Sequence, residues 1–224
     1  MIVWSKLLST RRTFLATFLL LALTVVALFL PVGSAARAQQ NPTATLAAKP
    51  VSLPDMALGQ SKAPITIIEY SSLTCPHCAD FEENVLPMLQ TKYIDTGKVR
   101  FVSREFPLDI QAAAASMLAR CAANGDAPKY FEATTMLFKQ QGPLMERTTD
   151  TLKAVGGRFG LTAEAVEACV KDQVLLDKLT ADQQFAFDEL KVDATPTFFI
   201  NGERLRGAMS FEEFEAKLTS HLKR

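Results

Sequence analysis

The sequence has no surplus of positive charge. Its 224 residues include 24 Lys and Arg against 24 Asp and Glu, so the formal net charge is zero. Proteins that bind nucleic acid over a large surface draw on a basic excess that neutralises phosphates. The charge balance therefore argues against nucleic acid as a partner.

Cysteine is scarce, with four in the chain. Dense disulfide frameworks are typical of short secreted chains that cannot build a core, and this chain is long enough to do without one. Hydrophobic residues make up 48% and charged residues 21%, as in ordinary globular proteins. The composition thus excludes a disulfide scaffold, a disordered chain and a collagen-like repeat. The length indicates one domain, or one domain with an insertion.

No apolar run reaches the roughly 20 residues that span a bilayer comfortably. The longest run, residues 15–30, follows three cations and precedes small residues that end at Ala38. This order is typical of a signal peptide over residues 1–38, exported by the Sec route or, given the arginine pair at 11–12, by the twin-arginine route. Extension of the run to Val32 leaves an uncleaved inner-membrane anchor open. Either form predicts a periplasmic location, where disulfides persist.

The rest of the chain changes its pattern three times. Residues 39–57 are rich in Ala, Thr, Pro and Gln without periodicity, which predicts a flexible tether. Residues 58–108 predict a β-α-β unit with parallel strands. Residues 109–190 carry helical patterns alone, and residues 191–224 predict two strands joined by an Asn-Gly hairpin and a last helix. Because a crossover needs only about a dozen residues, the long helical stretch indicates an inserted subdomain in an α/β fold.

The expected elements can be placed by residue range. We expect strands at 65–70, 99–106, 197–200 and 204–206. We expect helices at 76–96, 110–121, 127–140, 148–158, 162–171 and 173–190, and a final helix that Ser210 caps. Pro87 predicts a kink in the first of these helices, and Gly142-Pro143 predicts a break.

Cys75 and Cys78 form a Cys-x-x-Cys pair between a predicted strand and a predicted helix, as in thioredoxin-like redox sites. A cysteine at a helix N-terminus ionises easily, because unpaired backbone amides and the helix dipole stabilise the thiolate. Cys75 is therefore the expected nucleophile and Cys78 its partner. A protonated His77 would add a charge near Cys75 and favour an oxidising disulfide.

A Cys-x-x-Cys pair also occurs in zinc sites and in structural disulfides. A zinc site would need two more ligands from Cys121, Cys169, His77 and His221, none of which forms a second close pair. A structural disulfide within the pair would constrain little of the unfolded chain, because two residues separate the cysteines. We therefore expect neither a metal nor a cofactor.

Residues 67–78, which read Ile-Ile-Glu-Tyr-Ser-Ser-Leu-Thr-Cys-Pro-His-Cys, resemble the active-site segment of DsbA-type thiol:disulfide oxidoreductases. The resemblance extends from about Leu58 to the C-terminus and includes residues 194–202. It implies a thioredoxin fold with an inserted helical subdomain and an enzyme that introduces disulfide bonds into reduced exported proteins. It further implies a membrane quinone-linked reoxidant similar to DsbB. We expect a monomer.

The resemblance assigns roles to three further residues. Glu69 matches a buried acid that takes part in proton transfer around the inner cysteine, and burial should raise its pKa; a Glu69 that reaches water is the alternative. Pro196 matches a proline whose peptide bond is cis and faces the cysteine pair, so that the Thr195 backbone can pair with an extended substrate.

Thr195 also marks a departure from the best-known members, which have valine there, whereas periplasmic isomerases share threonine. An isomerase, or a reductase for cytochrome maturation, therefore stays open, as does a peptide-binding or metal-handling module on the same fold. The Pro-His dipeptide favours an oxidase. Residues 39–57 are also too few for the dimerisation domain of the isomerases.

Cys121 and Cys169 both lie on apolar faces of helices predicted within the insertion. Free buried cysteines are common in protein cores. Two cysteines within one small subdomain more often pair in an oxidising compartment, so we expect a structural disulfide between them.

Overall fold

A computed structural model describes residues 42–49 and 51–222 of the chain. The signal peptide expected over residues 1–38 lies outside the described residues and stays a prediction. Within the described ranges, no helix has both the length and the apolar character needed to cross a membrane.

Five strands form a mixed sheet in the order β1-β3-β2-β4-β5. They are β1 (Met56–Leu58), β2 (Ile65–Ser71), β3 (Val99–Glu105), β4 (Thr197–Ile200) and β5 (Glu203–Arg206). Strands β2 and β3 pair in parallel, and the other neighbouring strands of this sheet pair antiparallel. The sheet thus contains the expected β-α-β unit and C-terminal hairpin, together with β1, which the sequence did not predict.

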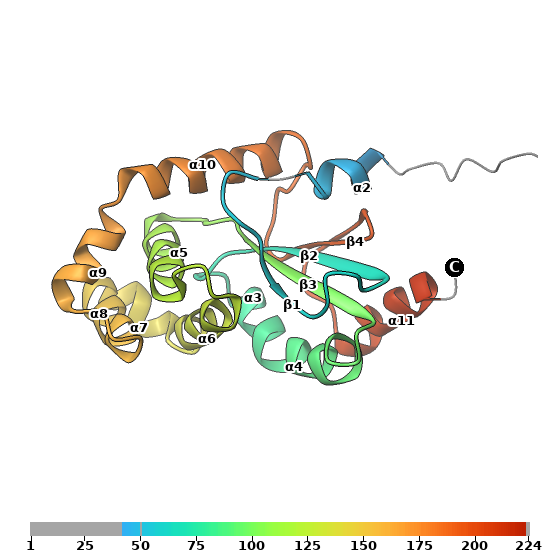
Figure 1. Cartoon of the computed structure of the whole chain (residues 1–224), viewed down its shortest axis with the longest axis horizontal. Helices are drawn as coiled ribbons and strands as arrows, with labels where there is room; N and C mark the ends of the chain where they lie inside the picture. The colour runs from blue at the N-terminus through green and yellow to red at the C-terminus, as the bar shows by residue number, and fades with distance from the viewer. Residues whose placement is uncertain (1–41, 50, 223–224) are drawn as a thin grey trace, which may run out of the picture. The chain divides into compact units, whose positions relative to one another are not determined.

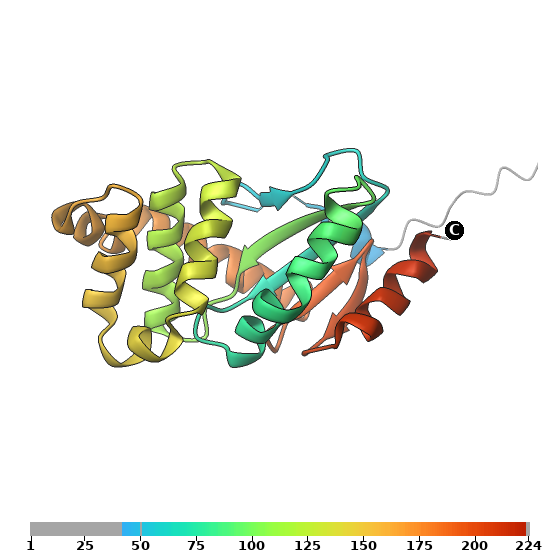
Figure 2. The same cartoon turned by 90° about the horizontal axis from the view of Figure 1, so that it is seen from below.

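Helices connect and cover these strands. The crossover from β2 to β3 consists of α3 (Pro76–Asp80), η2 (Phe81–Val85), α4 (Leu86–Leu89) and η3 (Gln90–Ile94). The insertion consists of α5 (Ile110–Ala123), α6 (Ala127–Phe138), α7 (Gln141–Glu146), α8 (Thr148–Arg158), α9 (Ala163–Val170) and α10 (Gln173–Asp188). Helix α2 (Pro42–Ala47) precedes the sheet and α11 (Phe211–Leu222) follows it. Figures 1 and 2 show α5–α9 gathered beside one end of the sheet, from which α10 runs back towards the strands.

The two proline-dependent expectations have different outcomes. Pro87 lies in α4, between the π-helical turns η2 and η3. Proline donates no backbone hydrogen bond, and the helix has a wider, π-helical turn on either side of α4. The disturbance predicted at Pro87 is thus a local change of helix type. The break predicted at Gly142-Pro143 is wrong, since both residues lie in the first turn of α7. Proline is tolerated there because the first amides of a helix have no partner within it.

Hydrophobic cores lie on both faces of the sheet. On one face, side chains of β2, β3 and β4 pack against the crossover helices and α11; the cluster includes Ile67, Phe101, Phe198, Phe81, Leu89 and Phe214. On the other face, the sheet packs against α2 and the C-terminal part of α10; this cluster includes Ile68, Tyr70, Val102, Phe199, Ala47 and Ala186. Figure 1 shows α10 and α2 on one side of the sheet and α3, α4 and α11 on the other.

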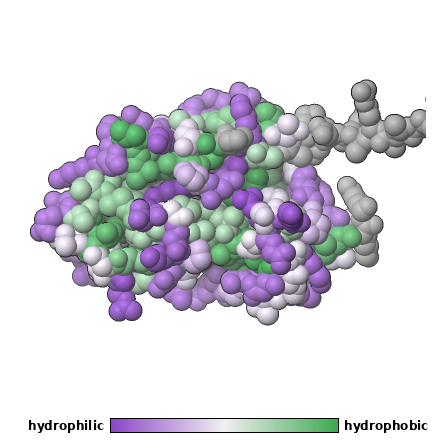
Figure 3. Space-filling view, in the orientation of Figure 1, coloured by the Kyte–Doolittle hydropathy of each residue, from purple (hydrophilic) through white to green (hydrophobic). Residues whose placement is uncertain are grey.

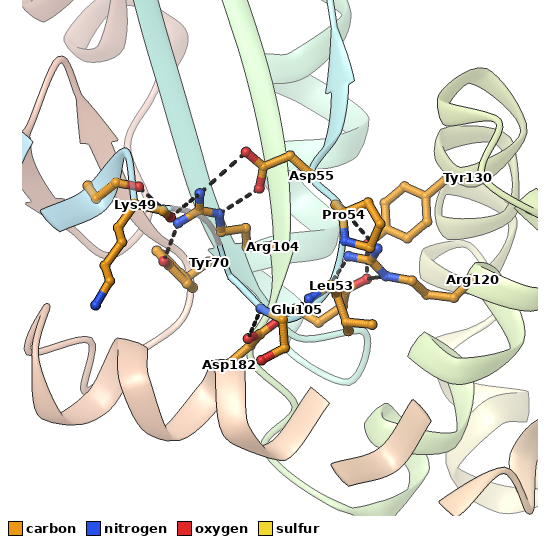
Figure 4. Close-up of polar contacts among 12 residues, drawn as sticks. Lys49, Leu53, Pro54, Asp55, Tyr70, Arg104, Glu105, Arg120, Tyr130 and Asp182 are labelled. Carbon is orange, nitrogen blue, oxygen red and sulfur yellow. Dashed lines mark hydrogen bonds and ion pairs between the residues drawn. The ribbon is translucent and has the colours of Figure 1, made fainter. Parts of the chain in front are cut away.

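The flexible tether expected over residues 39–57 is wrong for the part that the structure describes. Helix α2 packs on the sheet, Leu53 is buried, and β1 pairs with β3. Arg104 of β3 donates to Asp55 Oδ1 at 2.9 Å and to the carbonyl of Ala47 at 3.0 Å (Figure 4). Composition alone could not reveal these contacts, because the partners are distant in sequence.

A second arginine holds the same segment. Arg120 of α5 donates to the carbonyl of Pro54 at 2.6 Å, and to both carboxylate oxygens of Glu105 at 2.6 and 2.7 Å. Tyr130 of α6 donates to the same carboxylate at 2.8 Å. We call Asp55, Arg104, Glu105, Arg120 and Tyr130 the ionic clasp (Figure 4). It connects the N-terminal segment to the sheet and to the helical insertion.

Cys121 of α5 and Cys169 of α9 form a disulfide, the pairing expected from the sequence. Both cysteines belong to the insertion, and the bond joins the helices that carry them. The Cys121–Cys169 pair is therefore separate from the Cys75–Cys78 pair, which is free.

Hydrophobic side chains at the surface do not point to one docking face. The exposed large hydrophobic residues in the described ranges are Met88, Leu108, Ile110, Met145, Val174, Phe187 and Leu222. They are spread over five helices and one loop, and on the face seen in Figure 3 hydrophobic and hydrophilic residues are interspersed. Single exposed hydrophobic residues are normal and require no partner to explain them.

Candidate functional site

Cys75 lies in the loop between β2 and α3, directly before the helix. It is the N-cap of α3, with extended backbone angles, and Pro76 is the first helical residue. Its sulfur is therefore next to backbone N–H groups that have no partner within the helix. Cys75 is 5% exposed and Cys78, one turn further along, is 0% exposed. The two thiols thus differ in their access to solvent.

The helical insertion holds the loop that carries Cys75. Gln141 Nε2 donates to the carbonyls of Leu73 and Cys75 at 3.0 and 2.9 Å. Thr74 donates to Asp109, the N-cap residue of α5, at 2.6 Å. Sequence reasoning missed both anchors. The N-cap position of Asp109 was a usable signal, whereas no local pattern marked Gln141.

Thr195 and Pro196 face the cysteine pair from a segment far along the chain. The Thr195–Pro196 peptide bond is cis. Cys75 Sγ donates to the Thr195 carbonyl at 3.3 Å across a separation of 120 residues. The Thr195 hydroxyl is buried and has no hydrogen-bond partner in the described part of the chain. It is therefore available to donate to a Cys75 thiolate.

The environment lowers the pKa of Cys75 to about 5. The largest cause is hydrogen bonding from the Cys78 thiol, followed by the Thr195 side chain and the backbone N–H groups of Cys78 and His77, against the opposing effect of burial. These donors stabilise the thiolate of Cys75 more than its neutral thiol, and this difference lowers the pKa. Cys75 is consequently a thiolate at neutral pH.

Cys78 is shifted in the opposite direction. Burial raises the pKa of its thiol, and the hydrogen bond that it gives to Cys75 and the negative charge of Glu69 raise the pKa further. The inner sulfur is therefore a thiol at neutral pH. Any reaction that breaks a Cys75–Cys78 disulfide must deliver a proton to Cys78.

Glu69 is the buried acid of the site. It is 4% exposed, and burial raises its pKa well above the ordinary value, with the charge of Glu82 as the next cause. The alternative in which Glu69 reaches water is wrong.

Sequence reasoning missed Glu82, which accepts a hydrogen bond from Thr135 and whose own pKa is raised by burial. Its position four residues after Cys78 was a usable signal, because residues at that spacing share a helix face.

The His77 side chain is exposed at the start of α3. In the structure, His77 lowers the pKa of Cys75 through its backbone N–H group. The charge of its imidazole, which the sequence led us to expect, stays a prediction. Within the described ranges, no three His, Cys, Asp or Glu side chains are grouped closely enough to hold a metal ion.

Comparisons with known proteins agree with this geometry. The Thioredoxin family model matches residues 52–219. Putative protein-disulfide oxidoreductases of Rickettsia bellii and Rickettsia felis are 37% and 34% identical over 150 residues, which is 66% of this chain and 57% and 53% of those proteins. The chain thus matches little more than half the length of these curated relatives.

Solved structures match over most of their length. Wolbachia pipientis alpha-DsbA1 has a TM-score of 0.69 and 33% identity, with coverage of 77% of this chain and 94% of that one. Oxidised BdbD from Bacillus subtilis has a TM-score of 0.68 and 19% identity, with coverage of 76% and 94%. The second likeness concerns the fold alone. The expected thioredoxin fold with a helical insertion is confirmed.

Proposed function

Because the chain belongs to the DsbA-type branch of the thioredoxin family, we propose that it is a thiol:disulfide oxidoreductase that introduces disulfide bonds into exported proteins. The observation that carries the proposal is the opposite shift of the two thiol pKa values. The pKa of Cys75 is lowered to about 5 while that of Cys78 is raised. A stabilised Cys75 thiolate favours the reduced pair, which makes the disulfide a strong oxidant.

The reaction begins from the Cys75–Cys78 disulfide. A substrate thiolate attacks Cys75 Sγ, the bond to Cys78 breaks, and Cys78 leaves with the electron pair and takes up a proton. A second substrate thiolate then attacks the substrate sulfur of the mixed disulfide, and Cys75 leaves as a thiolate. The substrate loses two electrons to the pair, so the substrate dithiol is oxidised and Cys75 and Cys78 are reduced.

The neighbouring residues have supporting roles in this proposal. Thr195 and Pro196 form an edge at which an extended substrate docks through the Thr195 backbone. Glu69 exchanges protons with Cys78, and a protonated His77 adds charge near Cys75. The Cys121–Cys169 disulfide is structural. No step uses a metal or an organic cofactor.

The partners and location form part of the same proposal. Its substrates are reduced exported proteins, and a membrane quinone-linked protein similar to DsbB reoxidises the pair. Residues 1–38 direct export to the periplasm, as a cleaved signal or as an anchor. The enzyme acts as a monomer.

Oxidation of a synthetic peptide with two cysteines tests the proposal. Stoichiometric oxidised protein should convert the peptide dithiol to a disulfide while Cys75 and Cys78 become alkylatable. Cys75→Ser is the matched control and should give no conversion, although its fold is unchanged. Conversion by the variant at the wild-type rate, or none by wild type, would contradict the proposal.

Thr195 favours an isomerase as the second candidate function, because this residue departs from the valine of the best-known oxidases. The reduction potential distinguishes the two. An oxidase requires a potential near the value of about −120 mV known for DsbA, whereas an isomerase lies closer to about −180 mV. Equilibration with glutathione buffers and quantification of free thiols gives this value.

A further inference from the structure

The sheet surface beneath α3 changes from apolar to polar towards the carboxyl ends of β2 and β3. In order along the strands, the paired residues are Ile65 with Val99, Ile67 with Phe101, Glu69 with Ser103 and Ser71 with Glu105. The first two pairs belong to the hydrophobic core. The last two place four polar side chains on this face, and two of them, Glu69 and Ser71, act on the buried thiol of Cys78.

Ser71 is the residue of this group whose side chain lacks a hydrogen-bond partner in the described ranges. It is 9% exposed. A buried hydroxyl without a partner is costly and rare in folded proteins. The hydroxyl lies close enough to Glu69 and to Cys78 to lower the pKa of both. It is therefore poised between the buried acid and the inner sulfur.

A small cavity with both polar and apolar side chains in its wall opens beside Ser71. Its volume is about 10 Å³, and hydroxyl groups from three elements line it: Ser103 of β3, Ser116 of α5, and Tyr130 and Thr134 of α6. A cavity of this size holds one water molecule when several polar groups surround it. Such a water would supply the hydrogen bond that the Ser71 hydroxyl lacks.

We propose that Ser71 carries protons between Glu69 and the sulfur of Cys78, while one water in this cavity holds the Ser71 hydroxyl in place. The inference rests on the proposed function, in which Cys78 must gain a proton each time the disulfide opens. As Cys78 leaves, the Ser71 hydroxyl gives its proton to the sulfur and takes one from the Glu69 carboxyl. An S–H bond forms, the O–H bond of Glu69 breaks, and Ser71 ends unchanged. Reoxidation reverses the transfer.

The other charged groups near Ser71 are already engaged. Glu105, its strand partner, accepts from Arg120 and Tyr130. Glu82, which faces Glu69 from η2, accepts from Thr135. Glu69 lies next to the Ser71 hydroxyl and makes no ion pair within the described ranges, so it is the carboxyl that can release a proton towards Cys78. The strand position of Ser71, two residues after Glu69, places both side chains on one face, beside the inner thiol.

Single-turnover kinetics of Ser71→Ala test the relay. General acid–base groups contribute typically 10²–10⁴-fold, so reduction of the oxidised protein by a dithiol peptide should slow about tenfold or more at pH 7. A relay acts on both directions equally, so reoxidation should slow by the same factor and the equilibrium constant with glutathione should stay within about twofold of wild type. Ser71→Thr, which keeps a hydroxyl, should restore most of the rate.

Ser72→Ala is the matched control. Ser72 is also a buried serine, but its hydroxyl accepts from the Leu108 N–H and contacts Thr74. Its loss should leave the single-turnover rate within about twofold of wild type. Equal slowing by both alanine variants would show a packing effect and overturn the relay.

Two further results would also overturn the inference. One is a Ser71→Ala rate within twofold of wild type, and the other is a slower rate matched by an equal change in the equilibrium constant. The proposed function fails separately, and visibly, if wild-type protein does not oxidise the peptide at all.

Discussion

Two groups of buried polar residues lie near the carboxyl ends of β2 and β3, and they differ in how completely they are satisfied. In the ionic clasp, Arg104 and Arg120 bind carboxylates and carbonyls through geometrically good hydrogen bonds. At the thiol site, the hydroxyls of Ser71 and Thr195 have no partner in the described ranges, and the pKa values of Cys75, Cys78 and Glu69 are displaced.

The difference separates stability from chemistry. A buried charge that is fully paired resists change, because removing one partner leaves the other uncompensated in a low-dielectric interior. Buried groups with displaced pKa values gain or lose protons readily when a neighbour changes, as catalysis requires. We therefore expect substitutions in the clasp to lower stability with little effect on thiol chemistry, and substitutions at the thiol site to do the reverse.

The largest expected effect on stability comes from Arg120→Ala. It leaves the Glu105 carboxylate buried without its cation, and the free energy of unfolding should fall by about 3–5 kcal/mol. Urea denaturation of the oxidised protein measures the loss. The pKa of Cys75 and the oxidase rate of the folded fraction should not change.

Two controls sharpen this test. Adding Glu105→Gln to Arg120→Ala should recover part of the lost stability, because it removes the unpaired charge. Arg206→Ala breaks the exposed ion pair with Asp193 and should change stability little. A loss for Arg120→Ala no greater than for Arg206→Ala would refute the structural role of the clasp.

A smaller loss is expected when the Cys121–Cys169 disulfide is removed. Its cysteines are 48 residues apart, and the chain-entropy model gives about 4 kcal/mol for such a loop as an upper estimate. Cys121→Ser with Cys169→Ser should therefore melt at a lower temperature and keep wild-type activity. Calorimetry and peptide oxidation measure the two properties, and an inactive but folded double variant would place this disulfide in the chemistry.

The third expected effect, the smallest when counted for a change of one pH unit, is a pH dependence of the reduced protein. The folded pKa of Cys75, about 5, is below its unfolded value, so its stabilising contribution is fully present above the unfolded pKa and is lost as pH falls towards 5. The stability advantage of reduced wild type over Cys75→Ser should rise between pH 5 and about pH 8.5, by at most about 1.4 kcal/mol per pH unit.

Cys78 provides the opposite control for this pH series. Its folded pKa is raised, so its contribution is present below the unfolded pKa and is lost as pH rises above it. The advantage of reduced wild type over Cys78→Ser should therefore fall at alkaline pH. Parallel pH curves for the two serine variants would mean that the thiols do not differ in environment.

Much of the fold could be predicted from local sequence. The β-branched run of β2, the Asn-Gly turn before β5 and the helical spacing of the insertion each reflect interactions within a few residues, and the matching elements are present. Strand β1 and helix α2 could not be predicted, because contacts with Arg104 and Arg120 stabilise their packing from distant parts of the chain.

The same distinction applies to the candidate site. Cys75 and Cys78 were identifiable because their chemistry depends on a helix N-terminus, which the sequence indicates locally. Ser71 and Gln141 were not, because a serine in a strand or a glutamine at the start of a helix is ordinary until the fold places it beside a sulfur or a carbonyl.

The most direct test of the central claim is a thiolate titration of the reduced protein, followed by ultraviolet absorbance from pH 3 to pH 10. The site geometry predicts that one thiolate forms with a midpoint near 5, assigned to Cys75 because Cys75→Ser abolishes it. Cys78→Ala should retain a low midpoint, shifted upward by the loss of the largest donor. A wild-type midpoint above 8, the range of an unperturbed cysteine at about 8.5, would contradict the account of the site as an oxidising couple.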